Sequence, residues 1–472
     1  MGIQIALRSL LTLPLAVALA AQDPAIQSEF GKQALAGGRY EEAARIYADL
    51  AKRFPTEPGM LVNLGMAQHL SGDPKSAIVT FRAALKLNPN LPPAYLFLGS
   101  SQMQLGAPAL AIAPLRKFLT FDGRHGDARA MLADALLATG KPRDAAAEYR
   151  AFTKVAPHDP RGWQGLGRAN EAIATDAFTA LEKQQAGSVW SLLLVAEAQF
   201  EQRQFSSSYY LFREALKKSA RAPGAHEAIA RIYRESGHAD WAETEEKLGA
   251  GVKPLPPHLL YTRAKNAQKE AAAAYQRLVE LPPRIEIHMF LAETFRQQKR
   301  HIEEIAQWEA ALRFDPGNPS LLTELAIAKH YARDDAGAQA IVEKILPDAP
   351  DSPQLNFMLG DTLLSQQQAA KAVPYLEKAV ALDPKVLAAR SALARALIGA
   401  GRGAEAIPHL EAALPIDKDG SLHFQLGRAQ QAAGNAAAAK ETMASYQAIR
   451  AKMTAERRAL EEEVQITAPP AP

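Results

Sequence analysis

Apolar residues recur every three or four positions along most of the chain, in short stretches separated by turns that contain glycine or proline. This spacing places the apolar side chains along one face of a helix. Ala77 and Phe81, for example, are four residues apart and share a face. Alanine is abundant and runs of β-branched residues are scarce, which also favours helix. The pattern predicts a succession of short amphipathic helices.

The helical pattern repeats. Gly31, Gly65 and Gly99 follow one another at steps of 34 residues, and each comes directly after an apolar residue. Twelve residues after each glycine stands a small residue, and four further a large apolar one; Ala77 and Phe81 are such a pair. A period of this length indicates an array in which each helix pair buries its apolar face against its neighbours.

Glycine and proline also mark the ends of the predicted helices. Gly38, Gly72, Gly106 and Gly140 hold equivalent places between the two helices of a unit, where a helix end needs a positive φ. Proline at the end of a unit, as at Pro89, stops the second helix. The sequence therefore predicts a helix-turn-helix unit.

This unit resembles the tetratricopeptide repeat, whose pattern is Trp-x2-Leu-Gly-x2-Tyr, then Ala-x3-Phe, then a closing proline. Trp163–Gly167 (WQGLG) and Asn356–Gly360 (NFMLG) match its beginning, and Ala372 with Leu376 matches its second half. The resemblance covers about residues 24 to 453. It implies an all-α, right-handed superhelical solenoid of about thirteen helix-turn-helix repeats.

Two stretches, residues 168–188 and 249–265, are shorter than full units. We expect a shortened helix pair in the first. The second contains GAGVKPLPPH, whose three prolines forbid a continuous helix. The sequence therefore predicts two arrays, residues 22–250 and 251–453, which are followed at 454–472 by the end of a capping helix and a disordered proline-rich tail.

Residues 1–21 have the features of a secretory signal peptide in the usual order: a positive charge, an apolar run and a cleavage site. Arg8 is the only charge before the apolar run Leu10–Ala20, which ends in the small-x-small sequence Ala18-Leu19-Ala20. The run is too short for a confident membrane span. A buried first helix is the alternative, and Pro14 argues against it. We expect an exported, periplasmic or secreted protein with no transmembrane segment after cleavage.

Composition and motifs give little support for catalysis or nucleic-acid binding. The net charge of the 472 residues is +3, with both signs interspersed and no basic block. Cysteine is absent, which excludes disulfides and thiolate sites. His226, His288 and His423 fall where the repeat has its first tryptophan, so we interpret them as packing residues and not as metal ligands. We expect no enzyme activity, no cofactor, no metal and no nucleic-acid partner.

In the tetratricopeptide family the first helix of each unit lines a concave face. At the corresponding positions this chain has apolar, aromatic and basic residues, and clustered exposed Phe and Met are typical of contact sites. For each residue the alternative is ordinary helix surface or packing between repeats. The candidate partner-binding residues are Val62, Asn63, Met66, Leu96, Phe97, Ser100, Met103, Arg161, Arg168, Arg231, Arg234, Met289, Phe290, Tyr331, Phe357 and Met358.

The resemblance implies a non-catalytic scaffold or adaptor that binds peptide segments or partner proteins in its concave groove, in the periplasm. One alternative is a periplasmic subunit of an envelope assembly or polysaccharide export machine. Another is a repeat module associated with an enzyme. No stretch of about 100 residues escapes the repeat pattern, which leaves little room for a separate catalytic domain.

The first prediction concerns export. Because the signal pattern ends at Ala20 or Ala21, we expect the mature protein to begin directly after one of these residues. Amino-terminal sequencing of the protein from the envelope fraction checks this. An intact Met1 on a protein found in the cytosol would contradict it.

Overall fold

The computed structural model describes residues 23–463 and 465–470, so the predicted signal peptide lies outside the described residues. The described part contains 24 α-helices, α2 to α25, and no strand. Helices adjacent in the sequence pack against each other throughout most of the chain. The predicted all-α architecture of helix-turn-helix repeats is therefore confirmed.

Contacts divide the chain into two compact units. Of the described residues, the first comprises those up to Ala180 together with Thr262–Glu280, and the second comprises Leu181–Tyr261 and those from Leu281 onward. This division differs from the predicted arrays of residues 22–250 and 251–453, whose existence as separate arrays stays a prediction.

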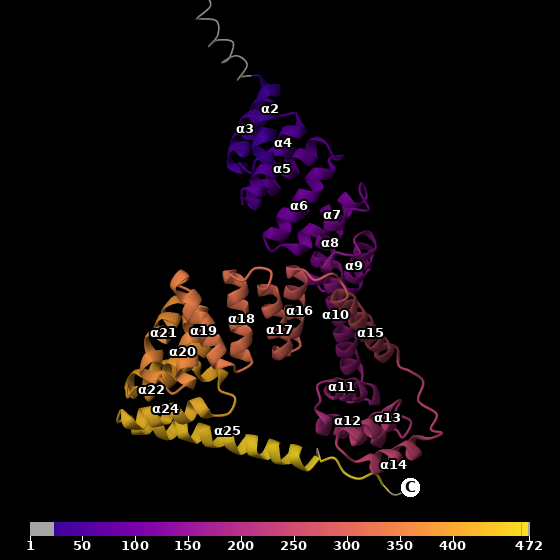
Figure 1. Ribbon diagram of the computed structural model, residues 1–472, viewed down its shortest axis with the longest axis vertical. Coiled ribbons are helices and arrows are strands. Elements are labelled where there is room, and N and C mark those ends of the chain that lie inside the picture. The colour runs from indigo at the N-terminus through magenta and orange to yellow at the C-terminus, as the bar shows by residue number, and fades with distance from the viewer. Residues whose placement is uncertain (1–22, 464, 471–472) are drawn as a thin grey trace, which may run out of the picture. The chain divides into compact units, whose positions relative to one another are not determined.

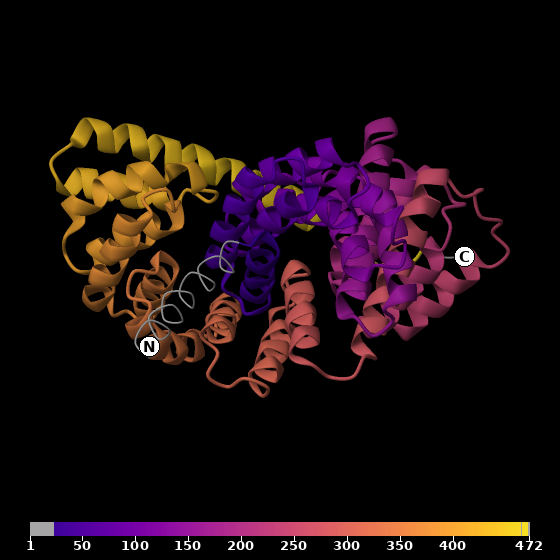
Figure 2. The same ribbon diagram turned by 90° about the horizontal axis from the view of Figure 1, so that it is seen from above.

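The first unit contains ten helices in whole or in large part (Figures 1 and 2). They are α2 (Pro24–Ala36), α3 (Tyr40–Arg53), α4 (Pro58–Leu70), α5 (Pro74–Leu87), α6 (Pro92–Gln104), α7 (Pro108–Leu119), α8 (Gly126–Ala138), α9 (Pro142–Val155), α10 (Pro160–Gln184) and α15 (Leu259–Val279).

The second unit contains the remaining helices. They are α11 (Val189–Glu201), α12 (Phe205–Lys218), α13 (Ala225–Glu235), α14 (Ala239–Gly249), α16 (Ile285–Gln297), α17 (His301–Leu312), α18 (Pro319–Tyr331), α19 (Asp335–Ile345), α20 (Pro353–Ser365), α21 (Ala369–Leu382), α22 (Leu387–Gly399), α23 (Gly403–Ala413), α24 (Ser421–Ala432) and α25 (Ala436–Glu463). Short 3₁₀ turns follow α19 and α23.

In six of the helix pairs that the structure describes, a glycine of the first helix contacts a large side chain of the second. A Cβ added at Gly65 would lie 2.7 Å from the ring of Phe81, and one at Gly99 would lie 2.6 Å from Leu115. Such distances are shorter than non-bonded carbon atoms tolerate, so the helices can approach this closely only at glycine. The predicted spacing of glycine and large apolar residue is thus the contact that joins the pair.

The hydrophobic core is divided along the chain. The described residues form six separate apolar clusters, each built from neighbouring helix pairs. One cluster, for example, contains Val62, Phe81 and Leu98, from α4, α5 and α6. This arrangement is typical of repeat proteins, in which each unit contacts only its neighbours.

One repeat is interrupted by two others, which corrects the expectation of a shortened helix pair at residues 168–188. Helix α10 continues as a single helix to Gln184, and its partner is α15, beside it in Figure 1. A Cβ at Gly167 would lie 2.4 Å from the ring of Tyr275, and the Tyr275 hydroxyl donates to Glu171 at 2.8 Å. Helices α11 to α14 are therefore inserted, in the sequence, between the two helices of one repeat.

The inserted repeats also change the number of units. With α10 and α15 as one pair, the 24 described helices form twelve pairs, where the sequence predicts about thirteen. Residues 250–258, between α14 and α15, form no helix, as their prolines predict. Arg221 holds this segment: its Nε donates to the carbonyl of Lys253 at 2.9 Å, and its own carbonyl accepts from Leu255 N at 3.0 Å.

Among the described residues, none of the helices combines the length and the apolar character that crossing a bilayer requires.

The second prediction tests the pairing of α10 with α15. Gly167→Ala should destabilise the first unit by about 1–3 kcal/mol, because the new methyl group overlaps the Tyr275 ring. Gly59→Ala is the matched control: its Cβ meets nothing within 4 Å, so it should be neutral or stabilising by about 0.5 kcal/mol. Urea denaturation, with hydrogen exchange read at α10 and α15, measures both variants.

The double variant Gly167→Ala/Tyr275→Ala sharpens this test. Since removal of the ring also removes the overlap, the double variant should lose less stability than the sum of the two single losses. Strict additivity would show that Gly167 and Tyr275 are not in contact.

Candidate partner-binding surfaces

The first candidate surface, the α4–α6 surface, comprises Met66, His69, Phe97, Ser100 and Met103. The rings of His69 and Phe97 meet edge to face with their centroids 5.5 Å apart. The Ser100 hydroxyl lies 3.3 Å from His69 Nε2. Met66 packs on the same apolar cluster as Phe97. All five side chains are half-buried, so the surface presents mixed apolar and hydrogen-bonding groups.

Sequence reasoning missed His69. It lies four residues after Gly65, the place that Met103 holds after Gly99 in the next unit. Met103 was among the candidates, so the same rule of positions would have included His69. Burial lowers the pKa of His69 from its ordinary value of 6.5. The ring is therefore neutral near pH 7, and one of its nitrogens accepts a hydrogen bond.

The other candidates in the first unit have structural contacts. Val62 is buried, with 7% of its surface exposed, and it packs in the core of its repeat. Asn63 and Leu96 are half-buried. Arg161 forms ion pairs with Asp159 and Asp127 at 2.6 and 2.7 Å, and the hydrogen bond to Asp159 is the main cause that raises its pKa.

Arg168 lies near the carboxyl group of Asp134. Asp134 accepts a hydrogen bond from Tyr149 at 2.5 Å. Burial raises the pKa of Asp134, while the hydrogen bond from Tyr149 and the charge of Arg168 act against this shift. Arg168 thus stabilises the ionised carboxylate.

The second candidate surface, the α18–α22 surface, comprises His330, Tyr331, Phe357, Asp361 and Arg395. Tyr331 ends α18 with 62% of its surface exposed. The His330 ring meets that of Phe357 edge to face, with centroids 6.1 Å apart. The carboxylate of Asp361 lies 3.8 Å from His330 Nε2 and 3.7 Å from the Arg395 guanidinium. Two predicted residues, Tyr331 and Phe357, thus lie beside polar groups from three first helices.

A buried charged cluster supports the α18–α22 surface. Glu304 is fully buried and accepts hydrogen bonds from Arg296 Nε at 2.5 Å and from His301 Nδ1 at 2.9 Å. Arg296 also pairs with Glu324 of α18 at 2.6 Å. Burial by itself would lower the pKa of Arg296, but the interactions of its guanidinium with the carboxylates of Glu304 and Glu324 outweigh burial and raise it. The ring of Tyr331 stacks on His301, with centroids 5.7 Å apart.

The remaining candidates of the second unit are dispersed. Met289 is 38% exposed and Phe290 is half-buried. Met358 is 2% exposed and belongs to the core. Arg231 lies over the ring of Phe200, 4.4 Å from its centroid.

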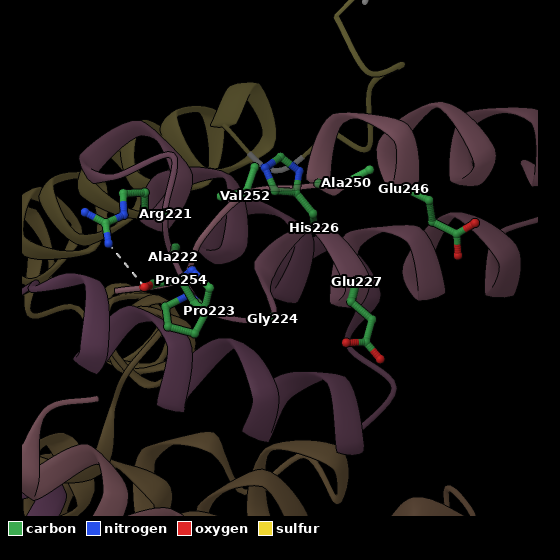
Figure 3. Close-up of a pocket in the computed structure, with 11 residues that line it drawn as sticks. Arg221, Ala222, Pro223, Gly224, His226, Glu227, Glu246, Ala250, Val252 and Pro254 are labelled. Carbon is green, nitrogen blue, oxygen red and sulfur yellow. Dashed lines mark hydrogen bonds between the residues drawn. The ribbon is translucent and has the colours of Figure 1, made fainter. Parts of the chain in front are cut away.

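A cavity of about 310 Å³ opens beside α13 and α14 (Figure 3). Arg234, a further candidate, pairs with Glu246, which lines this cavity. His226 lines it too, and its Nδ1 lies 2.6 Å from Oε1 of the buried Glu245. The Arg221 guanidinium binds the carbonyl of Pro254 at its edge. Arg221, His226 and Glu246, three of the polar residues that line the cavity, thus already have partners within the fold.

The histidines at the tryptophan positions have local partners. His226 contacts Glu245, His288 Nδ1 lies 2.9 Å from Gln307 Oε1, and His423 Nδ1 lies 2.6 Å from Asp417 Oδ2. In the part of the chain that the structure describes, no three His, Cys, Asp or Glu side chains form a group that could hold a metal ion.

Family models described as tetratricopeptide repeat match four stretches of the chain, residues 29–92, 126–169, 269–319 and 363–423. The third stretch begins inside α15 and includes α16 and α17. A comparison with curated proteins finds none that matches the chain.

Solved structures similar to the chain include a crystal structure of MamA protein, with 21% identity, a TM-score of 0.31 and coverage of 42% of this chain and 92% of that one. Another is MamA from Desulfovibrio magneticus RS-1, with 22% identity, a TM-score of 0.30 and coverage of 34% and 96%. The structure of Naa15/Naa10 bound to HypK-THB has 15% identity, a TM-score of 0.32 and coverage of 93% and 78%.

The third prediction concerns pH. Because the pKa of His69 lies below 6.5 in the folded chain, the unfolded chain takes up the proton first as the pH falls. Stability should be full above about pH 7 and should decrease as the pH falls through 6.5 towards the folded pKa. Urea unfolding at pH 7.5 and pH 5.0, read at α4 and α6 by hydrogen exchange, measures this.

The variant His69→Gln provides the control, since glutamine keeps hydrogen-bonding groups and does not titrate. Wild type should lose more stability on acidification than His69→Gln. Equal losses in the two proteins would show that His69 titrates alike in the folded and unfolded chains.

Proposed function

Because the chain is a tetratricopeptide-repeat protein, we propose that it is a non-catalytic scaffold that binds an extended segment of a partner protein on the α18–α22 surface. Tetratricopeptide repeats are modules of protein–protein interaction, and they present their first helices to partners. The observation that carries the proposal is the exposed Tyr331, which lies next to incompletely paired polar groups.

Tyr331 fits the role of an anchor for a partner. Tyrosine and arginine are enriched among the residues that dominate binding energy at interfaces. Tyr331 is exposed, yet its ring is held by stacking on His301 and by an edge contact with His330 at 5.9 Å. A side chain that is already ordered loses little entropy when a partner covers it. Arg395, 44% exposed in its side chain, lies on the same surface.

The polar groups beside Tyr331 suit a peptide backbone. The ion pairs of Asp361 are longer than hydrogen bonds, so its carboxylate retains capacity to accept N–H groups. An extended peptide offers alternating N–H and C=O groups, which Asp361 and Arg395 could bind while an apolar side chain packs on Tyr331 and Phe357.

The proposal places the scaffold outside the inner membrane, in the periplasm or beyond. Its support is the signal-peptide pattern of residues 1–21. A subunit of an envelope assembly or of a polysaccharide export machine would be a special case of the same scaffold, since such a subunit also works by holding other proteins.

The fourth prediction tests this surface. A photo-crosslinking amino acid placed at Tyr331 should capture one partner protein in the envelope fraction, and mass spectrometry should map the link to one extended segment. Ile302 on the second helix α17 is 79% exposed and is the matched control position. The same products from both positions, or none from Tyr331, would refute the proposal.

A substitution then measures the strength of the contact. With the captured segment as a synthetic peptide, Tyr331→Ala should weaken binding by about 1–3 kcal/mol, or roughly five- to 150-fold in Kd. Ile302→Ala should leave the Kd unchanged. Titration calorimetry gives both values.

A further inference from the structure

The carboxyl-terminal segment Gln465–Pro470 is extended and ends against the inserted helices (Figure 1). Two tyrosine hydroxyls, from Tyr209 of α12 and Tyr233 of α13, meet the carbonyl oxygen of Thr467 at 2.9 and 2.7 Å. Both tyrosines are buried, with exposed fractions of 3% and 0%. The sequence predicts a disordered tail, whereas this part of the tail has specific partners within the fold.

The hydrogen bonds at Thr467 are mutually consistent. A carbonyl oxygen has two lone pairs and so can accept both tyrosine protons. The Thr467 hydroxyl lies 2.9 Å from the Tyr209 oxygen, to which it can donate its own proton. Every hydroxyl then donates once. Burial raises the pKa of Tyr233, so this phenol keeps its proton and remains a donor.

An apolar contact accompanies the hydrogen bonds. Ile466 is half-buried and packs on the apolar cluster of α11 to α14, which includes Tyr209 and Tyr233. Gln465 and Ala468 are exposed. The site therefore recognises an apolar side chain together with the threonine that follows it. Pro469 and Pro470 restrict the backbone to extended conformations, which reduces the entropy that binding costs.

Tyr209 does not belong to the common repeat pattern, whereas Tyr233 stands at the tyrosine position of its repeat. In α12 the small position of the repeat is Ser208, whose hydroxyl donates to the carbonyl of Ala196 at 2.7 Å inside the pair. Tyr209 follows it and directs its hydroxyl at the tail instead. With the tail in place both phenol hydroxyls are buried and both have an acceptor, as buried hydroxyls require.

We propose that Tyr209 and Tyr233 form a peptide-binding site whose ligand is the chain's own tail, Gln465–Pro470, and that a partner segment of the same kind must displace this tail to bind. The inference extends the proposed function, on which it rests, to a second site with an internal competitor. A tether gives the tail an effective concentration on the order of 1 mM. A segment with a Kd of about 0.1 mM would then be bound about 90% of the time.

The experiment opens the site in two ways and offers the tail as a separate peptide. One variant of the full chain carries Ile466→Asp, which keeps the tail and removes its apolar contact. The other lacks residues 465–472. A fluorescent peptide of sequence QITAPPAP, residues 465–472, is titrated into wild type and both variants, and anisotropy gives the Kd. A peptide with aspartate in place of the isoleucine is the control ligand.

We expect QITAPPAP to bind both open variants and to bind wild type at least about tenfold more weakly, as an effective concentration of about ten times the Kd requires. The control peptide should not bind. Tyr209→Phe/Tyr233→Phe, introduced into the truncated chain, should weaken binding at least about fivefold, because phenylalanine keeps the packing and removes both donors. Circular dichroism checks that this variant is folded.

Three outcomes would overturn the inference. The first is a peptide that binds neither open variant, and the second is equal binding to wild type and open variants. The third is a wild-type dimer that dissociates when the tail is deleted, because the tail would then be exchanged between chains. The tail peptide does not involve Tyr331, so a failure here and a failure of the α18–α22 surface to capture a partner are separate results.

Discussion

The close approach of a small residue on the first helix to a large side chain on the second is the contact on which each repeat depends. A single helix pair has too little buried surface to be stable alone, and it becomes stable when the pair packs tightly and stacks on its neighbours. Gly31 with Tyr47 and Gly65 with Phe81 show this contact, with added Cβ atoms 2.7 Å from the ring in each case. Any side chain at these glycines would separate the helices and open the core.

The same contact explains how the two helices of one repeat still pack together when two other repeats are inserted between them in the sequence. Gly167 and Tyr275 are far apart in the sequence, yet they make the contact that Gly65 makes with Phe81. Arg150 and Glu270, which pair at 2.6 Å, add a further link between α9 and α15. The stability of a repeat comes from the contact between its two helices and not from the turn that joins them. Four further helices can therefore be inserted in the sequence between α10 and α15.

The sequence predicts the local unit well, because glycine, small and large positions have direct steric meaning. The predicted turn glycines Gly38, Gly72, Gly106 and Gly140 all have positive φ, between 67° and 87°. The partner of α10 could not be predicted in this way. A count of residues assumes that the two helices of a unit follow each other, and nothing in residues 168–184 shows that the second helix comes after the insertion.

The side-chain contacts between repeats also cannot be predicted from the positions of residues within the repeat. Tyr331 and Phe357 were recognised as candidates, but the role of His330 and Asp361 in joining them depends on how α18 and α20 pack. In the second unit some turns have no glycine: Arg203, Lys299, Arg333 and Gln367 take its place, with φ between 58° and 63°. These residues adopt a strained conformation because packing of the flanking helices outweighs a local cost of about 1 kcal/mol.

Buried charge adds a further constraint to one helix pair of the second unit, α16 with α17. Ala292 of α16 stands where other pairs have glycine, and the fully buried Glu304 of α17 binds Arg296 of α16. Desolvation makes such a pair weak evidence of stability, but a slip of one helix turn would leave the charge unpaired, at about 3–5 kcal/mol. The register of α16 and α17 is therefore specified by charge.

The buried charges that fix this register also contact residues of the proposed binding surface. Glu304 also accepts the hydrogen bond from His301, and His301 stacks on Tyr331. Arg296 links the same carboxylate to Glu324 of α18, the helix that Tyr331 ends. The exposed aromatic ring is thus oriented by a group with no exposed surface of its own. A partner that binds Tyr331 meets a side chain that is already ordered, and the entropy of ordering was lost when the repeat folded.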